Sequence, residues 1–330
     1  MKTKNIAYFL KTAVSLAILT ASVQAHAQSY PTKPINLIVP YSAGGSIDII
    51  GRLLGQKLAQ ELKVSVVVEN KTGFAGNIGA QIVARSAPDG YNLLMASLTT
   101  YSMNNKLSGP KQMGYDLLKD FRAIAVVGKM PEVLVVNKDV PANNLAELIT
   151  YLKKNPGKDA FGSSGLGSIG HVSGELFKLR AGVNILHVPY RGTPPALLDV
   201  MSGHIQMMFS TTPALLGDLA NGKLKAIAVA ADERDATLPN VPTLTEQGLA
   251  DLDLTSYPGV LVPVNTPDAI VAKLNASLQK ILKDPDVRKQ LSQQGIHALV
   301  NDTKEANQLF ANEVSKWDKL ITEAHIVLAK

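Results

Sequence analysis

Cysteine is absent from the 330-residue chain. Its absence excludes a disulfide framework, a thiolate metal site, a cysteine nucleophile and a lipid-modified cysteine anchor. Aromatic residues amount to only 5%, and no run of Lys or Arg with interleaved aromatics follows residue 27. Because such basic, aromatic patches are what nucleic acids bind, we expect no nucleic-acid partner.

A hydrophobic run long enough to span a membrane is also missing. Residues 1–27 have a basic start, the short apolar stretch "TAVSLAILT" and the small-residue sequence "AHA" at 25–27. This pattern predicts a Sec-type signal peptide cleaved near Ala27, and the apolar stretch turns polar around Gln24, short of the roughly 20 residues of a span. Removing the three Lys of this segment lowers the net charge from +6 to +3, so we expect a soluble, exported protein.

The chain is long enough for its core to divide into two lobes. Strand-like and helix-like segments alternate over residues 35–97 and again over 159–231, as in parallel sheets covered by helices. Between them, residues 101–120 form a polar stretch without clear periodicity, which predicts a break. Helices are predicted over 266–283, with Thr266 as N-cap and Pro267 first in the helix, and over 303–325, where the only Trp is expected in the core.

Three glycine-rich loops each follow a predicted strand and open a helix: "PYSAGGS" at 40–46, "NKTGFAGN" at 70–77 and "GSSGLGS" at 162–168. Ligands of open α/β sheets bind at such strand ends, where backbone N–H groups and the positive end of the helix dipole face outward. Each loop alone is more typical of a tight turn, but their repetition predicts an anion site in a cleft between two lobes. Neutral hydrogen-bonding side chains are available at Ser46, Asn77, Ser163, Ser164 and Ser168.

Two enzyme hypotheses rest on the third loop. Residues 165–170 form G-x-G-x-x-G, but the acidic residue expected about 20 positions on is replaced by Tyr190 and Arg191, which leaves an NADP-dependent oxidoreductase as a weak alternative. "LGSIG" at 166–170 resembles a nucleophile elbow and makes Ser168 a candidate hydrolase nucleophile, although no His stands in a distinctive position for it. No spacing typical of a metal site is present, so we expect neither metal nor cofactor.

Three charged or titratable residues near these loops have two interpretations each. Asp48 either complements the helix dipole or receives an ammonium or hydroxyl group of a ligand. His171 either donates to a carboxylate or makes a local structural contact. Arg191 either points into the cleft or forms a surface salt bridge.

Longer motifs make the chain resemble one family. "KPINLIVPYSAGGSIDIIGRLL", "ILHVPYRGTPPALLDVMSGHIQMMFS", "LPNVPTLTEQG" and "GVLVPVNTP" occur in order along the chain. They resemble the Bug-type, TctC-like periplasmic substrate-binding receptors of tripartite tricarboxylate transporter systems. The resemblance covers essentially the whole chain after residue 27.

The resemblance implies an α/β, two-lobe type II periplasmic-binding-protein fold. Each lobe would be a mainly parallel sheet flanked by helices, and two crossing strands would form the hinge. Residues 28–128 plus 257–330 would form lobe 1, and 129–256 lobe 2. The implied protein is a monomeric periplasmic receptor, not an enzyme, that delivers a small organic carboxylate to integral membrane transporter subunits; presentation of the ligand to a sensor is the alternative.

The family's ligand contacts fall in the same loops. Departures from its usual pattern, at Tyr41-Ser42-Ala43 and at Phe74, leave the ligand open and hint at an apolar or aromatic wall. The positions implied to bind ligand are Tyr41, Ser42, Ala43, Gly44, Gly45, Ser46, Asp48, Thr72, Gly73, Phe74, Ala75, Gly76, Asn77, Ser97, Ser163, Ser164, Gly167, Ser168, His171, Tyr190, Arg191 and Gly192.

Overall fold

The computed structural model describes residues 30–250 and 252–327. Every helix and strand below belongs to the compact unit Pro34–Lys330, the second of two units along the chain. The predicted signal peptide at 1–27 lies outside the described residues. Within the described part, none of the helices combines the length and the apolar composition that a membrane span requires.

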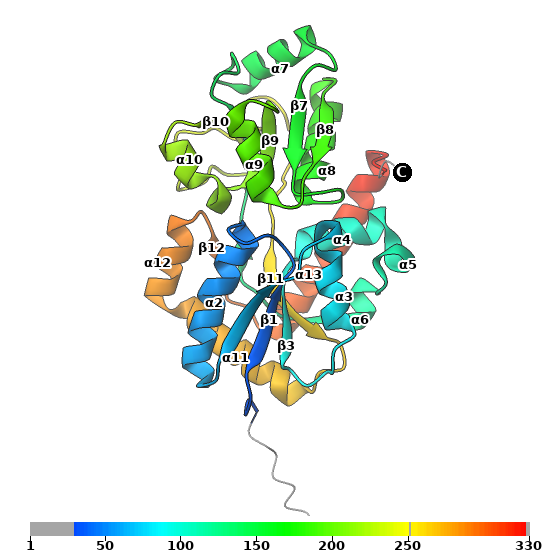
Figure 1. Ribbon diagram of the computed structural model, residues 1–330, viewed down its shortest axis with the longest axis vertical. Coiled ribbons are helices and arrows are strands. Elements are labelled where there is room, and N and C mark those ends of the chain that lie inside the picture. The colour runs from blue at the N-terminus through cyan, green and yellow to red at the C-terminus, as the bar shows by residue number, and fades with distance from the viewer. Residues whose placement is uncertain (1–29, 251, 328–330) are drawn as a thin grey trace, which may run out of the picture. The chain divides into compact units, whose positions relative to one another are not determined.

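Two five-stranded sheets form the two lobes of the second unit (Figure 1). The first has the order β2-β1-β3-β11-β4 and the second the order β10-β6-β9-β7-β8. The strands of the first sheet are β1 (Ile35–Val39), β2 (Val66–Asn70), β3 (Asn92–Ser97), β4 (Phe121–Val126) and β11 (Pro258–Pro263). Those of the second are β6 (Glu132–Asn137), β7 (Ala160–Ser163), β8 (Leu186–Pro189), β9 (Met207–Thr211) and β10 (Leu224–Ala230).

Both sheets are mixed, whereas the sequence analysis expected mainly parallel ones. β1 runs parallel to β2 and β3, but β11 runs antiparallel to both β3 and β4. In the second sheet β7 is parallel to β8 and β9, while β6 is antiparallel to β9 and β10. The antiparallel pairs involve β4, β6 and β11, which lie next to the two passages of the chain between the lobes.

The two passages pair with each other. Met130 and Ser256 form an antiparallel bridge, with N···O distances of 2.8 and 2.7 Å. A short strand, β5 (Gly128–Lys129), pairs beside this crossing with β12 (His297–Ala298). The expected two-stranded hinge is therefore present.

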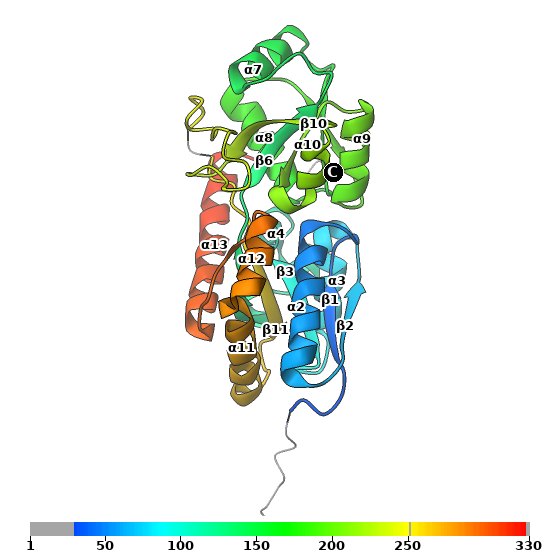
Figure 2. The ribbon, with the colours of Figure 1, turned by 90° about the vertical axis from the view of Figure 1, so that its left-hand side faces the viewer.

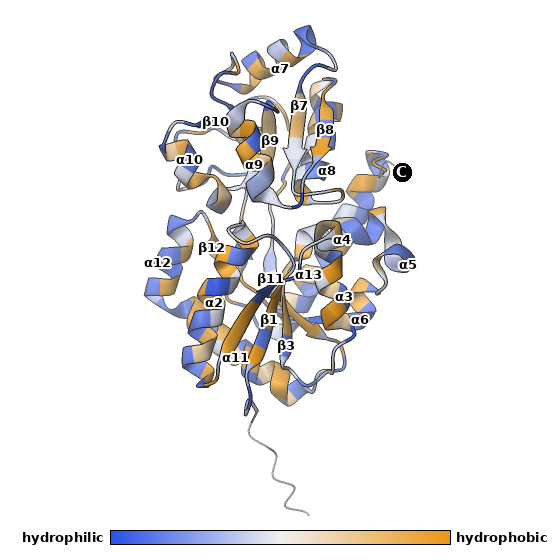
Figure 3. Cartoon of the chain, viewed as in Figure 1, coloured by the Kyte–Doolittle hydropathy of each residue, from blue (hydrophilic) through white to orange (hydrophobic). Residues whose placement is uncertain are grey.

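Helices cover both sheets, and their apolar residues account for their positions (Figure 3). In α2, Ile50, Leu54 and Leu58 recur at helical spacing and are fully buried. The other long helices are α3 (Asn77–Ala84), α7 (Leu145–Lys154), α8 (Ile169–Ala181), α9 (Thr193–Ser202), α11 (Asp268–Lys283), α12 (Pro285–Gln293) and α13 (Thr303–Glu323); α2 spans Ser46–Leu62 and the short α10 Leu216–Ala220. α7 and α12 were not predicted.

The predicted break at 101–120 is wrong. This stretch contains most of α4 (Leu98–Leu107) and all of α5 (Gly109–Met113) and α6 (Leu117–Asp120). Residues 98–104 of α4 are all buried, polar and apolar alike, so this part of the helix has no exposed face to create a period. Thr266 as N-cap is also wrong: α11 begins at Asp268 after Pro267, and the Thr266 hydroxyl donates to the Pro263 carbonyl oxygen.

α13 connects the two lobes (Figure 2). Its first half packs on the first sheet, where Phe310 joins the core of that lobe. Its second half joins the core of the other lobe, where Trp317 and Ile321 lie in one cluster with Phe177. Trp317 is fully buried, which confirms the predicted core role.

Candidate functional site

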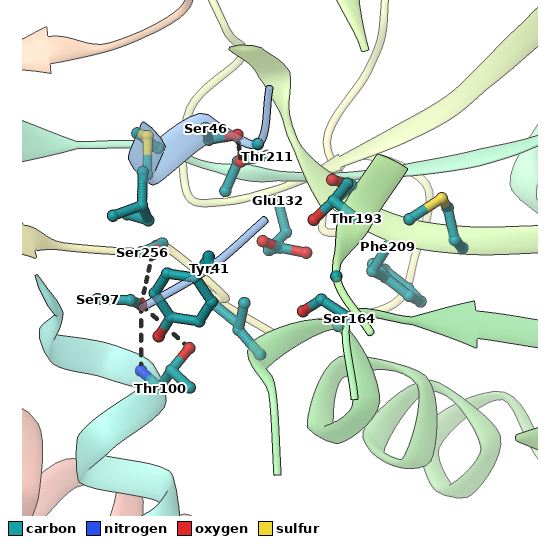
Figure 4. A pocket seen from close by; sticks show the side chains of 18 of the residues that line it. Tyr41, Ser46, Ser97, Thr100, Glu132, Ser164, Thr193, Phe209, Thr211 and Ser256 are labelled. Atoms are coloured by element: carbon teal, nitrogen blue, oxygen red, sulfur yellow. Dashed lines mark hydrogen bonds between the residues drawn. The ribbon is translucent and has the colours of Figure 1, made fainter. Parts of the chain in front are cut away.

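A cavity lies between the two lobes at the strand ends, and we call it the inner cavity (Figure 4). Its volume is about 60 Å³, where one water needs roughly 10–15 Å³, so it has room for a few waters or part of a small solute. It is lined by Tyr41, Ser42, Gly45, Ser46, Ile47, Ser97, Thr100, Met130, Glu132, Ser164, Ile169, Gly170, Gly192, Thr193, Met208, Phe209, Ser210, Thr211 and Ser256.

Four helices begin at the inner cavity. α2 presents Gly45 and Ser46 and α4 its N-cap Ser97, while α8 and α9 present Gly170 and Thr193. The N-caps of α2 and α9 are glycines without a capping side chain. Because the N-terminus of a helix carries unpaired N–H groups and a partial positive charge, the four together favour an anion.

Hydroxyl groups supply the polar lining between these helix ends. Ser46 and Thr211, from opposite lobes, hydrogen-bond at 2.5 Å between their side-chain oxygens. Ser97 donates to Thr100 at 3.0 Å and lies 3.4 Å from the Ser256 hydroxyl. No Lys, Arg or His is among the described residues that line the inner cavity, so an anion there would depend on neutral donors.

A second, wider hollow of about 250 Å³ adjoins the inner cavity, and we call it the outer cavity. The two share Tyr41, Ser42, Ser164 and Gly192. The remaining lining of the outer cavity is mostly apolar or backbone, with one charged residue at its rim: Pro40, Thr72, Gly73, Phe74, Ala75, Gly76, Gly165, Leu166, Pro189, Tyr190 and Arg191.

Direct contacts close the lobes over these cavities. The Ser42 hydroxyl donates to the Arg191 carbonyl oxygen at 2.6 Å. The Asn104 amide of α4 donates to the Gly167 carbonyl oxygen at 3.2 Å. A Cβ on Gly167 would come within 2.2 Å of the Asn104 side chain, so glycine there allows the lobes to approach.

Asp48 holds the first loop in place and does not line either cavity. Its carboxylate accepts hydrogen bonds from the Gly44 N–H, Arg52 and Asn70 at 2.8–2.9 Å. Burial alone would raise the pKa of Asp48, but these hydrogen bonds and the Arg52 charge hold it below its usual value. The arrangement fits a role in shaping the loop that α2 presents to the cavity.

The second loop is held by Asn77 at the start of α3. Its amide donates to the Phe74 carbonyl oxygen at 2.8 Å and accepts from the Tyr115 hydroxyl at 2.5 Å. Phe74 and Ala75 both have φ near +48°, a conformation that costs side-chain-bearing residues energy. This backbone conformation places Phe74 at the wall of the outer cavity, while Asn77 lies outside the lining.

Two histidines hold the third loop. His171 accepts from the Gly167 N–H at 3.1 Å and stacks on His187 with ring centroids 4.1 Å apart, while His187 lies 2.7 Å from the Ser163 hydroxyl. Burial lowers the pKa of His187 to about 3, and it also lowers that of His171. Both rings are therefore neutral, and their hydrogen bonds hold the third loop in place.

Ser168 caps α8 and does not resemble a nucleophile. Its hydroxyl oxygen accepts the His171 backbone N–H at 3.3 Å. His171 and His187 each use one ring nitrogen, for the Gly167 N–H and the Ser163 hydroxyl. Among the described residues no hydrogen bond joins the Ser168 hydroxyl to an imidazole, the contact by which a serine hydrolase activates its nucleophile.

Known proteins are similar to this chain over most of its length. The family model described as "Tripartite tricarboxylate transporter family receptor" matches residues 50–326. The chain belongs to this family. A Pseudomonas sp. (strain P51) protein named "UPF0065 protein in tcbD-tcbE intergenic region" is 34% identical over 312 residues, covering 94% of this chain and 92% of that protein. "Protein BugT" of Bordetella pertussis is 33% identical, with coverage of 94% and 95%.

Solved structures give the same fold. The periplasmic binding protein BugD superposes with a TM-score of 0.85 at 35% identity, covering 90% of this chain and 99% of that one. "R. palustris Rpa4515 with adipate" gives 0.87 at 32%, with coverage of 90% and 99%, and "MatC (Rpa3494) from Rhodopseudomonas palustris with bound malate" gives 0.82 at 33%, with 88% and 100%. The two-lobe periplasmic-binding-protein fold is confirmed, and the chain is a solute-binding receptor of the Bug type. A solute-binding receptor is not an enzyme class.

In this receptor the predicted binding residues divide into two groups. Those lining the cavities come from all three glycine-rich loops, the end of β3 and the loop after β8: Tyr41, Ser42, Gly45, Ser46, Thr72, Gly73, Phe74, Ala75, Gly76, Ser97, Ser164, Tyr190, Arg191 and Gly192. Those outside the lining are Ala43, Gly44, Asp48, Asn77, Ser163, Gly167, Ser168 and His171. Most of the second group hold the loops in shape.

Sequence reasoning missed several lining residues of the receptor. Glu132 is the most unusual, because it is a carboxyl group only 1% exposed at the start of a fully buried strand, "EVLVVN", whose next four residues are apolar. The sequence alone shows this acidic residue at the start of an apolar strand, and such a residue is rarely fully buried unless it has a partner. The other missed residues lie in the hinge, in β9 or in helix starts, and are Ile47, Thr100, Met130, Ile169, Gly170, Thr193, Met208, Phe209, Ser210, Thr211 and Ser256, with Pro40, Gly165, Leu166 and Pro189 in the outer cavity.

Proposed function

We propose that this receptor binds a small organic carboxylate in the inner cavity and delivers it to the integral membrane subunits of a tripartite transporter. The observation that carries the proposal is the meeting of four helix N-termini with neutral hydroxyls and no cationic side chain. Such a site stabilises a carboxylate by main-chain and hydroxyl donors without the cost of burying an opposing ion. Two similar proteins, Rpa4515 with adipate and MatC with bound malate, agree with this class of ligand.

The ligand-binding residues that we propose are the predicted residues that line the two cavities. The inner cavity would hold one carboxylate against Ser46, Ser97 and Thr193. The remainder of the solute would extend past Ser164 into the outer cavity, towards Phe74. An apolar wall there suits an aliphatic or aromatic chain.

We further propose that the receptor works in the periplasm as a monomer, after removal of residues 1–27. Lobe 1 would comprise residues 28–128 plus 257–330 and lobe 2 residues 129–256, and a ligand would shift the lobes towards the closed form. Mass spectrometry of the exported protein tests the cleavage site, and light scattering tests the monomer. Uptake of labelled acid by cells with and without the receptor distinguishes delivery to a transporter from presentation to a sensor.

A thermal-shift screen followed by calorimetry tests the ligand class. Acids with one, two and three carboxylates are compared with amino acids and with the uncharged amides or methyl esters of the same acids. A ligand that binds only the native state at 100 times its Kd stabilises it by about 2.7 kcal/mol. Binding of an acid but not of its amide supports the proposal, and equal binding of both contradicts it.

A further inference from the structure

Glu132 is the first residue of β6, two positions after the hinge bridge at Met130. It pairs with Thr211 of β9 on one side and with Ala230 of β10 on the other. Its side chain points into the inner cavity between Tyr41 and Ser164 (Figure 4). It therefore lies at the crossing of the hinge and the site.

One oxygen of the Glu132 carboxyl group is not satisfied by the protein. Its Oε2 is buried and has no hydrogen-bond partner among the described residues. A buried polar atom without a partner costs about 1–3 kcal/mol. Its orientation into a cavity indicates that a bound molecule supplies the missing partner.

Charged groups of the elements packed against β6 face elsewhere. On β10, Lys225 donates to the Val140 carbonyl oxygen near the far end of the strand. On α9, the Asp199 carboxylate accepts from the Tyr190 hydroxyl at 2.6 Å. β9 carries no charged residue.

The loops around Glu132 offer no opposing charge either. Asp235, after β10, accepts from the Thr212 hydroxyl at 2.6 Å. In the lining of the inner cavity, the other titratable side chain is Tyr41. Burial raises the pKa of Tyr41, so that it stays neutral. No Lys, Arg or His is among the described residues that line the inner cavity, so none of its lining residues balances a negative charge on Glu132.

Under these conditions, a carboxylate ligand and an ionised Glu132 would oppose each other. Burial raises the pKa of Glu132 to about 8, while the four helix N-termini act in the opposite direction by favouring an anion. Two carboxyl groups in one low-dielectric site do not both ionise, because like charges at short range favour retention of a proton by one of them. Below about pH 8 Glu132 is thus protonated with or without a ligand, and above that pH the ligand's arrival favours uptake of a proton by Glu132.

We propose that Glu132 is a ligand-binding residue that acts in its protonated form and donates its carboxyl hydrogen to an anionic oxygen of the bound solute. This inference rests on the proposed function, because it takes the solute to be a carboxylate. It assigns the receptor a preference for acids without a neighbouring ammonium group, since a neutral Glu132 offers an ammonium no counter-ion. Binding at high pH then takes up one proton from solvent.

Calorimetry of adipate, malate and glutarate between pH 5.5 and 9.5 tests the inference. For the wild-type receptor, Kd should be constant below pH 8 and rise by up to tenfold per pH unit above it. Glu132→Gln keeps an N–H donor and has no titration, so its Kd should stay within about threefold of the low-pH wild-type value at every pH. Glu132→Ala should weaken binding about tenfold at all pH values, because the donor is lost.

A matched control removes another buried carboxyl group. Glu313 lies in α13, where it accepts from Thr99 and Trp317, and burial raises its pKa as well. Glu313→Gln should keep the wild-type pH dependence of binding, with circular dichroism confirming that each variant is folded. A glutarate and glutamate pair tests the ligand charge, and the wild type should prefer glutarate.

The outcomes separate the two proposals. If adipate, malate and glutarate all fail to bind at every pH, the proposed function and this inference fall together. If they bind but the pH dependence survives in Glu132→Gln, only this inference is wrong. A wild-type preference for glutamate over glutarate that Glu132→Gln abolishes would also overturn it, because an ionised Glu132 would then be the ammonium's partner.

Discussion

The Ser42 hydroxyl donates a 2.6 Å hydrogen bond to the carbonyl oxygen of Arg191, and so ties the first loop of one lobe to the β8–α9 loop of the other. Both residues lie at the rim of the cavities, where the lobes meet. Separation of the lobes would break this contact. It therefore adds to the stability of the closed form over the open one.

Ser42→Ala should weaken ligand binding about fivefold, because one interlobe hydrogen bond contributes about 1 kcal/mol to closure. The melting temperature of the ligand-free protein should change little. Ser202→Ala is the control, since the Ser202 hydroxyl bonds within α9 to the Asp199 carbonyl oxygen. Calorimetry checks both variants, and equal affinity in Ser42→Ala and the wild type would contradict the role of the contact.

Gly192 faces Ser42 across the same closure. A Cβ at Gly192 would lie 2.2 Å from the Ser42 hydroxyl oxygen, and its φ of +124° is strained for any other residue. Gly192→Ala should therefore prevent full closure and weaken binding more than tenfold. Gly222→Ala is the control: with φ of +65° and nothing within 4 Å of its Cβ, it carries only the smaller cost of a left-handed residue and should bind normally.

A double variant isolates the steric cause. Replacing Ser42 by Gly in the Gly192→Ala background removes the clashing side chain and should recover part of the affinity. Small-angle scattering with and without ligand measures closure directly. Full affinity of Gly192→Ala would show that the lobes need not approach this closely.

The sequence predicted an element correctly where the spacing of its apolar residues and the residues of the adjoining loop indicated the same element. α2 shows this well, because Ile50, Leu54 and Leu58 mark its buried face and glycines precede it. α4 was missed because residues 98–104 are buried on every side, so tertiary packing removed the pattern that a surface helix shows. The mixed direction of the sheets depends on where the chain crosses between lobes, which local sequence does not encode.

The glycine-rich loops predicted the location of the site, but not the role of each residue. Ser46 and Asp48 stand two positions apart, yet one faces the cavity and the other is turned back to Gly44, Arg52 and Asn70. Helical geometry turns successive residues by about 100°, and only the finished packing decides which direction is the cavity. Glu132 was missed since the strand direction that points it inward is set by its pairing with β9 and β10.

Tyr41→Phe tests the wall shared by the two cavities. The Tyr41 hydroxyl is buried, and although the Thr100 and Ser97 hydroxyls lie beside it, no hydrogen bond of good geometry to it forms among the described residues. Removing it should leave the ligand-free protein equally stable or more stable by about 1 kcal/mol, because an unsatisfied polar group is lost. If the hydroxyl donates to the ligand, calorimetry should show a loss of affinity of about fivefold; loss of stability with unchanged affinity would assign the hydroxyl to the fold.

Glu132→Gln should change the pH dependence of folding even without a ligand. Burial raises the pKa of Glu132 in the native protein to about 8, against 4.5 for the unperturbed group. Between these values the native state holds a proton that the unfolded state has released, so the wild-type free energy of unfolding falls as pH rises through this window. Below pH 4.5 both states are protonated and the penalty is absent.

The Gln variant lacks this titration, so its advantage over the wild type should grow from pH 5 to pH 8 and then level off. One pH unit within the window corresponds to roughly 1.4 kcal/mol at most, which makes the expected difference at pH 8 a few kcal/mol in favour of Gln. Urea unfolding of both proteins at pH 5, 6.5, 8 and 9 measures it. A pH-independent difference between Glu132→Gln and the wild type would mean that this carboxyl group titrates in the native protein as it does in the unfolded chain.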